Sequence, residues 1–168
     1  MELTLSRLHE LFDYKDGNLI WKIATSPRVK VGDIAGYLNE YGYIGIGIDG
    51  SSYKAHRLIY FYHNGCLPSN IDHIDGNKSN NKIENLRSAT TSQNAMNQKI
   101  STKNSSGVKG VYWHKRDKKW VVQLKGDSKR YSFGYFNDKK EAELVAIEET
   151  NKLHKEFSAY KGVLNGTA

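Results

Sequence analysis

Up to residue 65, segments with apolar residues at helical spacing and segments with strand-like spacing follow one another along the chain. Three leucines beginning at Leu5 recur at helical spacing, and the turn-forming sequence DYKDGN follows them. The next segment, GNLIWK, predicts a short strand, and the small and β-branched residues around Asp49-Gly50 predict a hairpin. From His56, an apolar and aromatic run predicts a buried helix that ends near Gly65. This part is therefore expected to mix short helices and strands.

Residues 71–97 follow a pattern of strand, loop, strand and helix. The first strand is predicted at 71–73 and the second at 83–88, with a loop rich in Asn, Asp and Gly between them. Thr90 and Gln93 have the spacing of a capping box, so a helix is expected to begin at Thr90 or at the next residue. In such a ββα unit, the end of the first strand, the second strand and the helix start can converge on one small pocket.

The C-terminal part predicts three short strands and one helix. The strands are expected at about 108–113, 120–125 and 131–136, separated by basic turns. Asp138 and Glu141 have capping-box spacing ahead of an amphipathic helix. Along the middle strand, one alternating set is expected to pack on this helix and the other to face outward: Trp120, Val122 and Leu124 inward, and Val121, Gln123 and Lys125 outward.

Composition narrows the class of protein. The chain has 168 residues, enough for one ordinary domain or two small ones. Its one cysteine, Cys66, excludes an intramolecular disulfide, and no apolar run approaches the roughly 18 residues that a membrane span needs. The N-terminus lacks the basic and then apolar pattern of a signal peptide. A cytoplasmic protein with no membrane partner is therefore expected.

Positive charge is concentrated in the C-terminal part. Residues 1–97 hold ten Lys+Arg and ten Asp+Glu, so the whole formal charge of +7 lies in residues 98–168. This charge favours a polyanionic partner. The polar segment NQKISTKNSSG at the boundary predicts a linker. The expected organisation is an N-terminal domain at 1–97, a linker at 98–107 and a C-terminal domain at 108–168.

The stretch IDHIDGNKSNNKIENL contains more Asn, Asp and His than a turn requires. Asp72 supplies an anionic oxygen and Asn94 an amide oxygen, which suit Mg²⁺ or Mn²⁺ with water and substrate phosphate completing the coordination. Histidine accepts protons near neutral pH, so His73 can take a proton from an attacking water. Asn85 is a candidate for orienting the imidazole. These residues outline a site that cleaves phosphodiesters. The other asparagines are interpreted as loop formers: Asn77, Asn80 and Asn81.

The segment AHRLIYFYHNGCLPSNIDHIDGNKSNNKIENLRSATTSQNAMN resembles the HNH nucleases, specifically the phage and intron-encoded homing endonucleases. Their signature is an Asp-His pair, an Asn twelve residues after the His and another Asn nine residues further, which matches this chain. The resemblance covers about residues 54–97. It implies metal ligation by Asp72 and Asn94, His73 as general base and Asn85 as the residue that orients His73. A single cysteine excludes the Cys₄ zinc site of other family members.

The C-terminal part resembles the DNA-binding domain of the Apetala and ethylene-response-factor type. The matching residues are GVKGVYW, KWVVQL and GYFNDKKEA with the helix after them, over about residues 106–160. Such domains place a three-stranded sheet in the major groove of DNA. The resemblance therefore implies contacts between this sheet and double-stranded DNA. The candidates are Lys109, Tyr112, His114, Arg116, Gln123, Lys125 and Arg130, and Arg57 is a further candidate for contacting phosphate in the N-terminal part.

The expected fold class is α+β, with an N-terminal ββα-metal nuclease domain followed by a small three-stranded antiparallel sheet plus a helix. The expected function is that of a metal-dependent DNA endonuclease of the HNH homing type, acting in the host cytoplasm if the chain is phage-encoded. One catalytic unit per chain favours nicking by a monomer. Formation of a dimer is the alternative. The alternatives are a non-catalytic sequence-specific DNA-binding regulator, and a structural or RNA-associated protein that uses the basic module alone. All four catalytic positions are filled, which argues against a degenerate nuclease.

Overall fold

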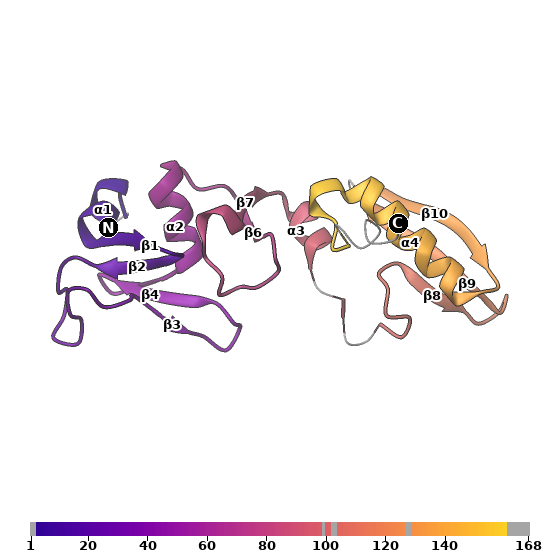
Figure 1. Ribbon diagram of the computed structural model, residues 1–168, viewed down its shortest axis with the longest axis horizontal. Helices are drawn as coiled ribbons and strands as arrows, with labels where there is room; N and C mark the ends of the chain where they lie inside the picture. The colour runs from indigo at the N-terminus through magenta and orange to yellow at the C-terminus, as the bar shows by residue number, and fades with distance from the viewer. Residues whose placement is uncertain (1–2, 99, 102–103, 127–128, 161–168) are drawn as a thin grey trace. The chain divides into compact units, whose positions relative to one another are not determined.

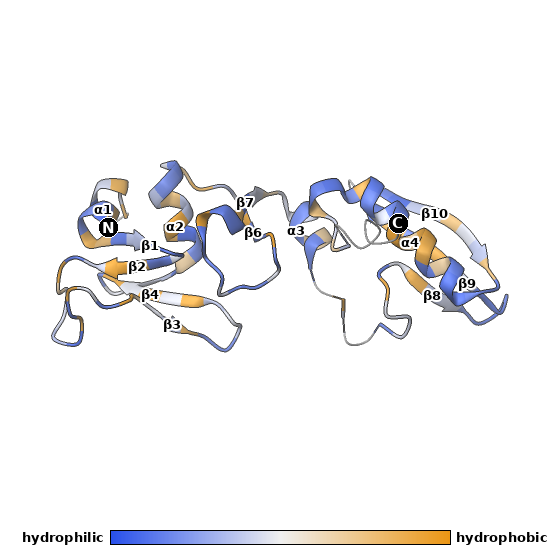
Figure 2. Cartoon of the chain, in the orientation of Figure 1, coloured by the Kyte–Doolittle hydropathy of each residue, from blue (hydrophilic) through white to orange (hydrophobic). Residues whose placement is uncertain are grey.

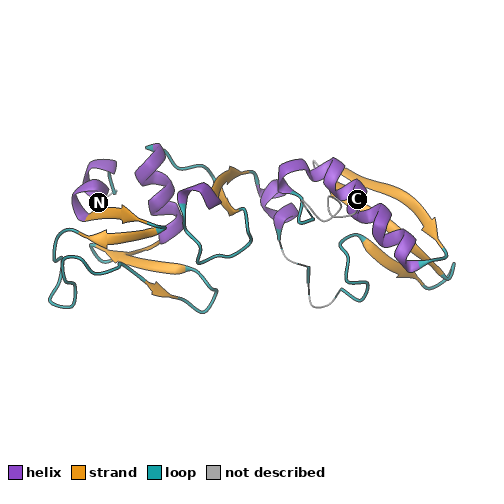
Figure 3. Cartoon of the chain, viewed as in Figure 1, coloured by secondary structure: helices purple, strands orange, loops and turns teal. Residues whose placement is uncertain are grey.

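The computed structural model describes residues 3–98, 100–101, 104–126 and 129–160. Its packing divides the chain into two compact units, Met1–Ala89 and Thr90–Ala168. Each unit combines helices with antiparallel strands, as Figure 3 shows, which confirms the mixed α+β class. Within the described part of the chain, no helix combines the length and the apolar character that crossing a membrane requires.

The first unit starts with the predicted helix, but the chain then forms a hairpin whose first strand includes residues 13–15 of the predicted turn. Helix α1 (Leu5–Leu11) is followed by strands β1 (Phe12–Lys15) and β2 (Asn18–Trp21), which pair in an antiparallel hairpin. The hairpin turn places Asp16 and Gly17 at φ angles of 48° and 85°. Asp and Gly reach this left-handed region at low cost, so the sequence of the turn selects its geometry.

A second small sheet and a helix complete the framework of this unit. The sheet contains β3 (Tyr37–Leu38), β4 (Ile44–Ile48) and β5 (Ser51–Lys54), in that order. The predicted hairpin between β4 and β5 is confirmed, because Asp49 and Gly50 both have positive φ angles, as a two-residue turn of this kind requires. Helix α2 (Ala55–Asn64) follows directly and ends at Gly65, which has a left-handed conformation as expected.

One apolar core holds these elements together. Helix α2 packs on α1 and on strands β2, β4 and β5, and Figure 1 shows α1 and α2 lying to one side of β1 and β2. Burying a large apolar side chain stabilises a fold by about 1.5–3 kcal/mol, so this cluster dominates the stability of the unit. Its most completely buried members are Leu8, Leu11, Phe12, Leu19, Ile46 and Ile59, and Ile71 and Leu86 join them from the next two strands.

Strands β6 (Asn70–His73) and β7 (Leu86–Ala89) form a two-stranded antiparallel sheet. The first predicted strand is confirmed. The second begins later than predicted, because Ile83–Asn85 forms the 3₁₀ turn η1 before the chain becomes extended. The Asn85 side chain bonds the loop that precedes it, and this contact favours a turn at that point.

The second unit contains a short helix, a three-stranded sheet and a long helix. The elements are α3 (Thr91–Asn97), β8 (Val111–His114), β9 (Lys119–Gly126), β10 (Lys129–Phe136), α4 (Lys139–His154) and the 3₁₀ turn η2 (Lys155–Phe157). Thr90 and Gln93 form the predicted capping box of α3, and Asp138 caps α4 by accepting a hydrogen bond from Glu141 N. Both helix starts are therefore confirmed.

Helix α4 lies along one face of the sheet, and Figure 2 shows hydrophobic and hydrophilic residues alternating along it. Val122 packs against Ala142 and Ala146 in the core between sheet and helix, as predicted. Val121 lies on the outward face, as expected, but its side chain is covered and only 1% exposed. Tyr112 and Tyr135 are its cross-strand partners, and their large rings flank the smaller valine on the same face.

The predicted linker at 98–107 includes Lys99, Thr102 and Lys103, which lie outside the described residues. The last eight residues of the predicted C-terminal domain, 161–168, also lie outside them.

Candidate active site

Asp72 and His73 are the last two residues of β6, and both are buried. Arg87 is the cross-strand partner of Asp72 on β7. Its Nε and one terminal guanidinium nitrogen donate to Asp72 Oδ2 over 2.9 and 2.7 Å. A buried carboxylate is costly without a partner, so this ion pair makes the position of Asp72 tolerable and ties β6 to β7.

His73 contacts an asparagine that the sequence pattern did not single out. The His73 Nε2 and Asn81 Oδ1 atoms are 3.0 Å apart, and Asn81 is 3% exposed. Because an amide oxygen accepts, this bond places the imidazole proton on Nε2 and leaves the ring lone pair on Nδ1. The interpretation of Asn81 as a loop former is therefore incomplete: it also orients the candidate base.

Asn85 organises the loop that carries Asn81. Its Nδ2 donates to Asp75 Oδ1 over 3.0 Å and to Asn80 O over 2.8 Å, and its Oδ1 accepts from Asp75 N over 3.1 Å. The Asn80 side chain also donates to Asp75 Oδ2. The hydrogen bonds of Asn85 thus run to the loop, and its influence on the His73 ring passes through Asn81.

Asp75 is the acceptor at the centre of this network. Burial disfavours its charged form, but hydrogen bonds from the Asn80 side chain, Asn77 N and the Asn85 side chain outweigh that cost and lower the pKa of the carboxyl below its ordinary value. Asp75 therefore stays ionised and holds the loop closed. The only hint in the sequence is the density of Asn and Asp, which does not distinguish one such residue from another.

A second buried histidine lies beside His73. The rings of His56 and His73 meet edge to face with 5.0 Å between their centroids, and the Tyr43 ring lies 5.3 Å from His56. Burial lowers the pKa of His56 to about 3, and the nearby His73, Lys54 and Arg57 add to this effect. His56 is thus a neutral packing partner near pH 7. Arg57 donates to Ser69 O over 3.4 Å.

Asn94 lies on α3 and belongs to the second unit, where its backbone N–H donates to Thr90 O. The described residues contain no group of three His, Cys, Asp or Glu side chains that could hold a metal ion. One buried carboxylate, Asp72, is still compatible with Mg²⁺, because this ion often binds one or two carboxylates and otherwise keeps water and phosphate ligands. The donor chemistry therefore fits a metal that is shared with the substrate.

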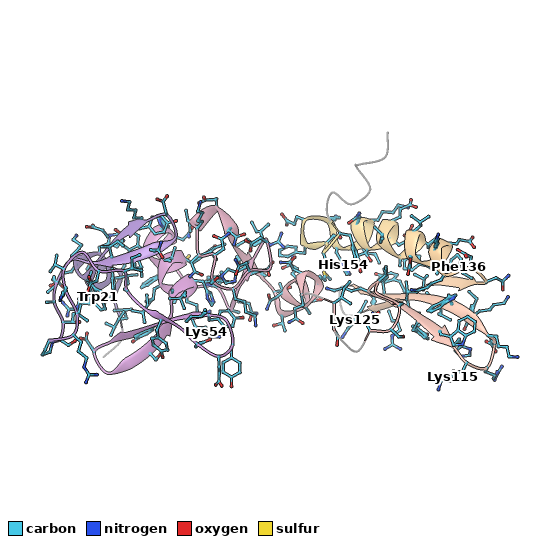
Figure 4. All side chains as sticks on the ribbon, turned by 60° about the horizontal axis from the view of Figure 1, so that its bottom comes forward. Trp21, Lys54, Lys115, Lys125, Phe136 and His154 are labelled. Atoms are coloured by element: carbon cyan, nitrogen blue, oxygen red, sulfur yellow. The ribbon has the colours of Figure 1, made fainter. Side chains whose placement is uncertain are left out.

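The sheet of the second unit brings together several of the predicted DNA contacts. One shallow pocket is lined by four of them, Tyr112, Gln123, Lys125 and Arg130, together with Leu124. Arg130 and Lys125 are paired across β10 and β9, so their side chains share a face. Figure 4 labels Lys125 on this sheet and Lys115 at the turn between β8 and β9.

Three predicted DNA contacts have partners inside the second unit. Lys109 Nζ donates to Met96 O over 2.9 Å, and burial lowers the pKa of this amine. His114 Nδ1 lies 3.1 Å from Asp117 Oδ2, and Arg116 Nε lies 3.2 Å from Asp117 Oδ1. The Arg116 side chain is 90% exposed, whereas Lys109 is half-buried. Arg116 is therefore more accessible to DNA than Lys109.

Comparison with known proteins identifies the class of enzyme. The HNH endonuclease family matches residues 53–96, the segment that contains Asp72, His73, Asn85 and Asn94. This match identifies the protein as a nuclease. HNH nucleases act on DNA and typically use a divalent metal ion.

Two viral proteins are similar over longer stretches. Protein 3.8 of Escherichia phage T7 is 34% identical over 116 residues, which cover 65% of this chain and 93% of that protein. An uncharacterized HNH endonuclease of Acanthamoeba polyphaga mimivirus is 42% identical over 78 residues, 45% of this chain and 41% of that protein. The chain belongs to the HNH endonucleases, in one family with the phage protein. No solved structure matches it.

The position of the nuclease segment corrects one expectation. The matched segment lies in the middle of the chain, not at its N-terminus, and it ends within α3. The residues before it form α1 and strands β1 to β4, and they share the core that Ile71 and Leu86 enter from β6 and β7. The nuclease segment thus depends on preceding elements for its hydrophobic support.

Proposed function

We propose that this protein is a metal-dependent DNA endonuclease in which His73 acts as the general base. The contact that supports this role is the bond between His73 Nε2 and Asn81 Oδ1, because it favours the tautomer in which Nδ1 carries the basic lone pair. Nδ1 takes a proton from water, the water oxygen forms a bond to phosphorus, and the bond from phosphorus to the leaving sugar oxygen breaks. Asn81 and His56 hold the ring during this step.

Asp72 and Asn94 are the proposed metal ligands. Their assignment rests on the spacing of the family signature and on the oxygen chemistry of both side chains. A bound Mg²⁺ or Mn²⁺ supplies positive charge that stabilises the phosphate and the leaving oxygen. Arg87 neutralises Asp72 in the structure described here, which allows the carboxylate to remain buried.

The second unit is proposed to bind double-stranded DNA through the outer face of its sheet. The shared pocket of Tyr112, Gln123, Lys125 and Arg130 supports this proposal, because cations and amides on one face suit phosphate contacts and base edges. The Apetala-type resemblance of residues 106–160 agrees with this use of the sheet. With one catalytic unit per chain, a monomer nicks one strand. A homing role is proposed from the resemblance of residues 54–97 to homing endonucleases, and the similarity to a phage protein supports action in the cytoplasm of an infected cell.

A nicking assay on supercoiled plasmid DNA tests the central proposal. The parent chain should convert supercoiled to open-circular DNA in the presence of Mg²⁺ or Mn²⁺, and His73→Ala should slow this conversion by about 10²-fold or more. Binding of duplex DNA should change little, since the substitution removes only the base. DNA binding without metal-dependent nicking by the parent chain would instead identify a non-catalytic DNA-binding regulator.

A further inference from the structure

Two lysines converge on one tyrosine ring beside the candidate base. Lys54 Nζ and Lys78 Nζ lie 4.5 and 4.8 Å from the centroid of the Tyr43 ring. The same ring lies 5.3 Å from the ring of His56 and 6.3 Å from that of His73. The lysine pair, Lys54 and Lys78, therefore borders the site where the proposed chemistry takes place. Figure 4 labels Lys54 in the first unit.

Three separate parts of the fold build this arrangement. Tyr43 directly precedes β4, Lys54 ends β5 and is the N-cap residue of α2, and Lys78 belongs to the loop that Asp75 and Asn85 hold closed. Lys78 Nζ also donates to Tyr41 O over 3.2 Å. The negative face of the ring attracts each ammonium group electrostatically. Both ammonium groups are thus positioned before any ligand arrives.

Within the described residues, no carboxylate neutralises the lysine pair, and the same holds for Lys15 and Lys30 of this unit. Arg7, Lys22 and Arg87 each lie within 4.0 Å of a carboxylate, whereas neither Lys54 nor Lys78 forms an ion pair within the described residues. Two like charges around one ring repel each other, and an anion between them relieves this repulsion. A positive site therefore exists in residues 1–97, although their formal charges sum to zero.

We infer that Lys54, Lys78 and Tyr43 form a binding site for a DNA backbone phosphate adjacent to the bond that is cleaved. This inference rests on the proposed nuclease function. The two ammonium groups donate to the phosphate oxygens, and the Tyr43 ring keeps both side chains in place. The site fixes the strand relative to His73, so it acts on positioning as well as on affinity. It also gives the nuclease segment DNA contacts of its own.

The test compares two double variants of the full chain. Lys54→Gln with Lys78→Gln removes the lysine pair, and Lys15→Gln with Lys30→Gln removes two exposed lysines from the same unit as a matched control. Duplex DNA binding is measured by fluorescence anisotropy at several salt concentrations, and single-turnover cleavage is measured with Mg²⁺. Each neutralised phosphate contributes about 0.9 to the slope of log affinity against log salt.

The first variant should flatten this slope by up to about 1.8 and weaken binding about tenfold near physiological salt, while the control keeps the slope of the parent. Its cleavage rate at saturating DNA should also fall, because the strand is held less well. Equal slopes for the two double variants would overturn the inference. A parent that binds DNA without cutting it would refute the nuclease proposal, and the comparison of slopes would still decide whether the phosphate site exists.

Substitutions of Tyr43 provide a second test that leaves the net charge unchanged. Tyr43→Phe keeps the ring and should retain the affinity and salt slope of the parent. Tyr43→Leu keeps both lysines but removes the ring that positions them, and it should weaken DNA binding several-fold. If Tyr43→Leu binds as tightly as Tyr43→Phe, the ring does not organise the lysine pair and that part of the inference is wrong.

Discussion

The imidazole of His73 is held by two buried neighbours, each with a different kind of contact. Asn81 bonds Nε2, and the His56 ring meets the imidazole edge to face. A general base works only when its lone pair points at the proton that it removes, so ring orientation affects the rate directly. Asn81 and His56 are therefore positioning residues in the proposed mechanism, and both can be tested separately from the base itself.

Substitutions of Asn81 should change cleavage to different extents. Asn81→Leu has a similar size but no acceptor, and it should slow cleavage roughly 10–100-fold, as losses of supporting contacts often do. Asn81→Asp keeps an acceptor at the same position and should therefore retain more of the cleavage rate than Asn81→Leu. Equal cleavage rates in Asn81→Leu and the parent would contradict the contact.

His56 should make folding stability depend on pH. Its pKa is lowered to about 3 in the folded chain, against an ordinary value near 6.5 when unfolded. The unfolded chain therefore takes up a proton as pH falls below 6.5 while the folded chain does not, and stability is lost in that direction. Between pH 7 and pH 5 this loss is up to about 2 kcal/mol.

Urea unfolding of the parent and of His56→Phe at both pH values measures this effect. His56→Phe cannot be protonated, so the difference in unfolding free energy between pH 7 and pH 5 should shrink. The control is His63→Asn, whose histidine also has a pKa lowered by burial but is exposed, and which should alter the pH dependence less. The account fails if His56→Phe retains the full pH dependence of the parent.

At the scale of elements, the two faces of the sheet in the second unit have different roles: one packs on the long helix and the other is the proposed DNA-binding face. The inner face of β9 packs on α4, whereas Gln123 and Lys125 join Tyr112 and Arg130 on the other side. Adjacent cations on one sheet face are placed to contact phosphates along one groove wall. DNA binding should therefore depend on this face and not on the helix.

Two matched variants test this division. Lys125→Gln with Arg130→Gln should weaken duplex DNA binding about tenfold near physiological salt and flatten the salt slope by up to about 1.8. Lys139→Gln with Lys140→Gln removes the same charge from the start of α4 and should leave both quantities close to the parent values. Similar losses in both variants would mean that net charge, not the sheet face, determines affinity. Anisotropy at several salt concentrations provides both quantities.

At the scale of the whole molecule, the two proposed metal ligands belong to different compact units. Asp72 lies on β6 in the first unit and Asn94 on α3 in the second. Both proposed ligands lie within the matched nuclease segment, residues 53–96, so the metal requirement tests the assignment of that segment.

Removal of metal should stop cleavage, and Mg²⁺ or Mn²⁺ should restore it. Asp72→Ala and Asn94→Ala should each raise the metal concentration for half-maximal cleavage by about tenfold or more, since losses even of supporting contacts cost that much. Asn64→Ala on α2 removes an exposed amide whose partner is Tyr60 O, and it serves as the control. Full activity in excess chelator would rule out the metal-dependent mechanism.

Elements defined by near neighbours could be predicted from the sequence. The capping box of Thr90 and Gln93, the Asp49-Gly50 turn and the helix end at Gly65 all formed as expected. Each involves contacts over four residues or fewer, so the local sequence determines its geometry. The family signature likewise identified the nuclease segment, because its spacing is visible along the chain.

Contacts between distant residues were decided by the tertiary structure. The loop contains several asparagines that look equivalent in the sequence, yet folding places Asn81 against His73 and Asn85 against Asp75. Tyr43, Lys54 and Lys78 come from three separate segments, and no spacing predicts that they meet. Local patterns carry no information on such encounters, because they depend on how the shared core positions β4, β6 and α2. The sequence alone thus determined the class of enzyme and its short elements, and packing decided which polar side chains surround the base.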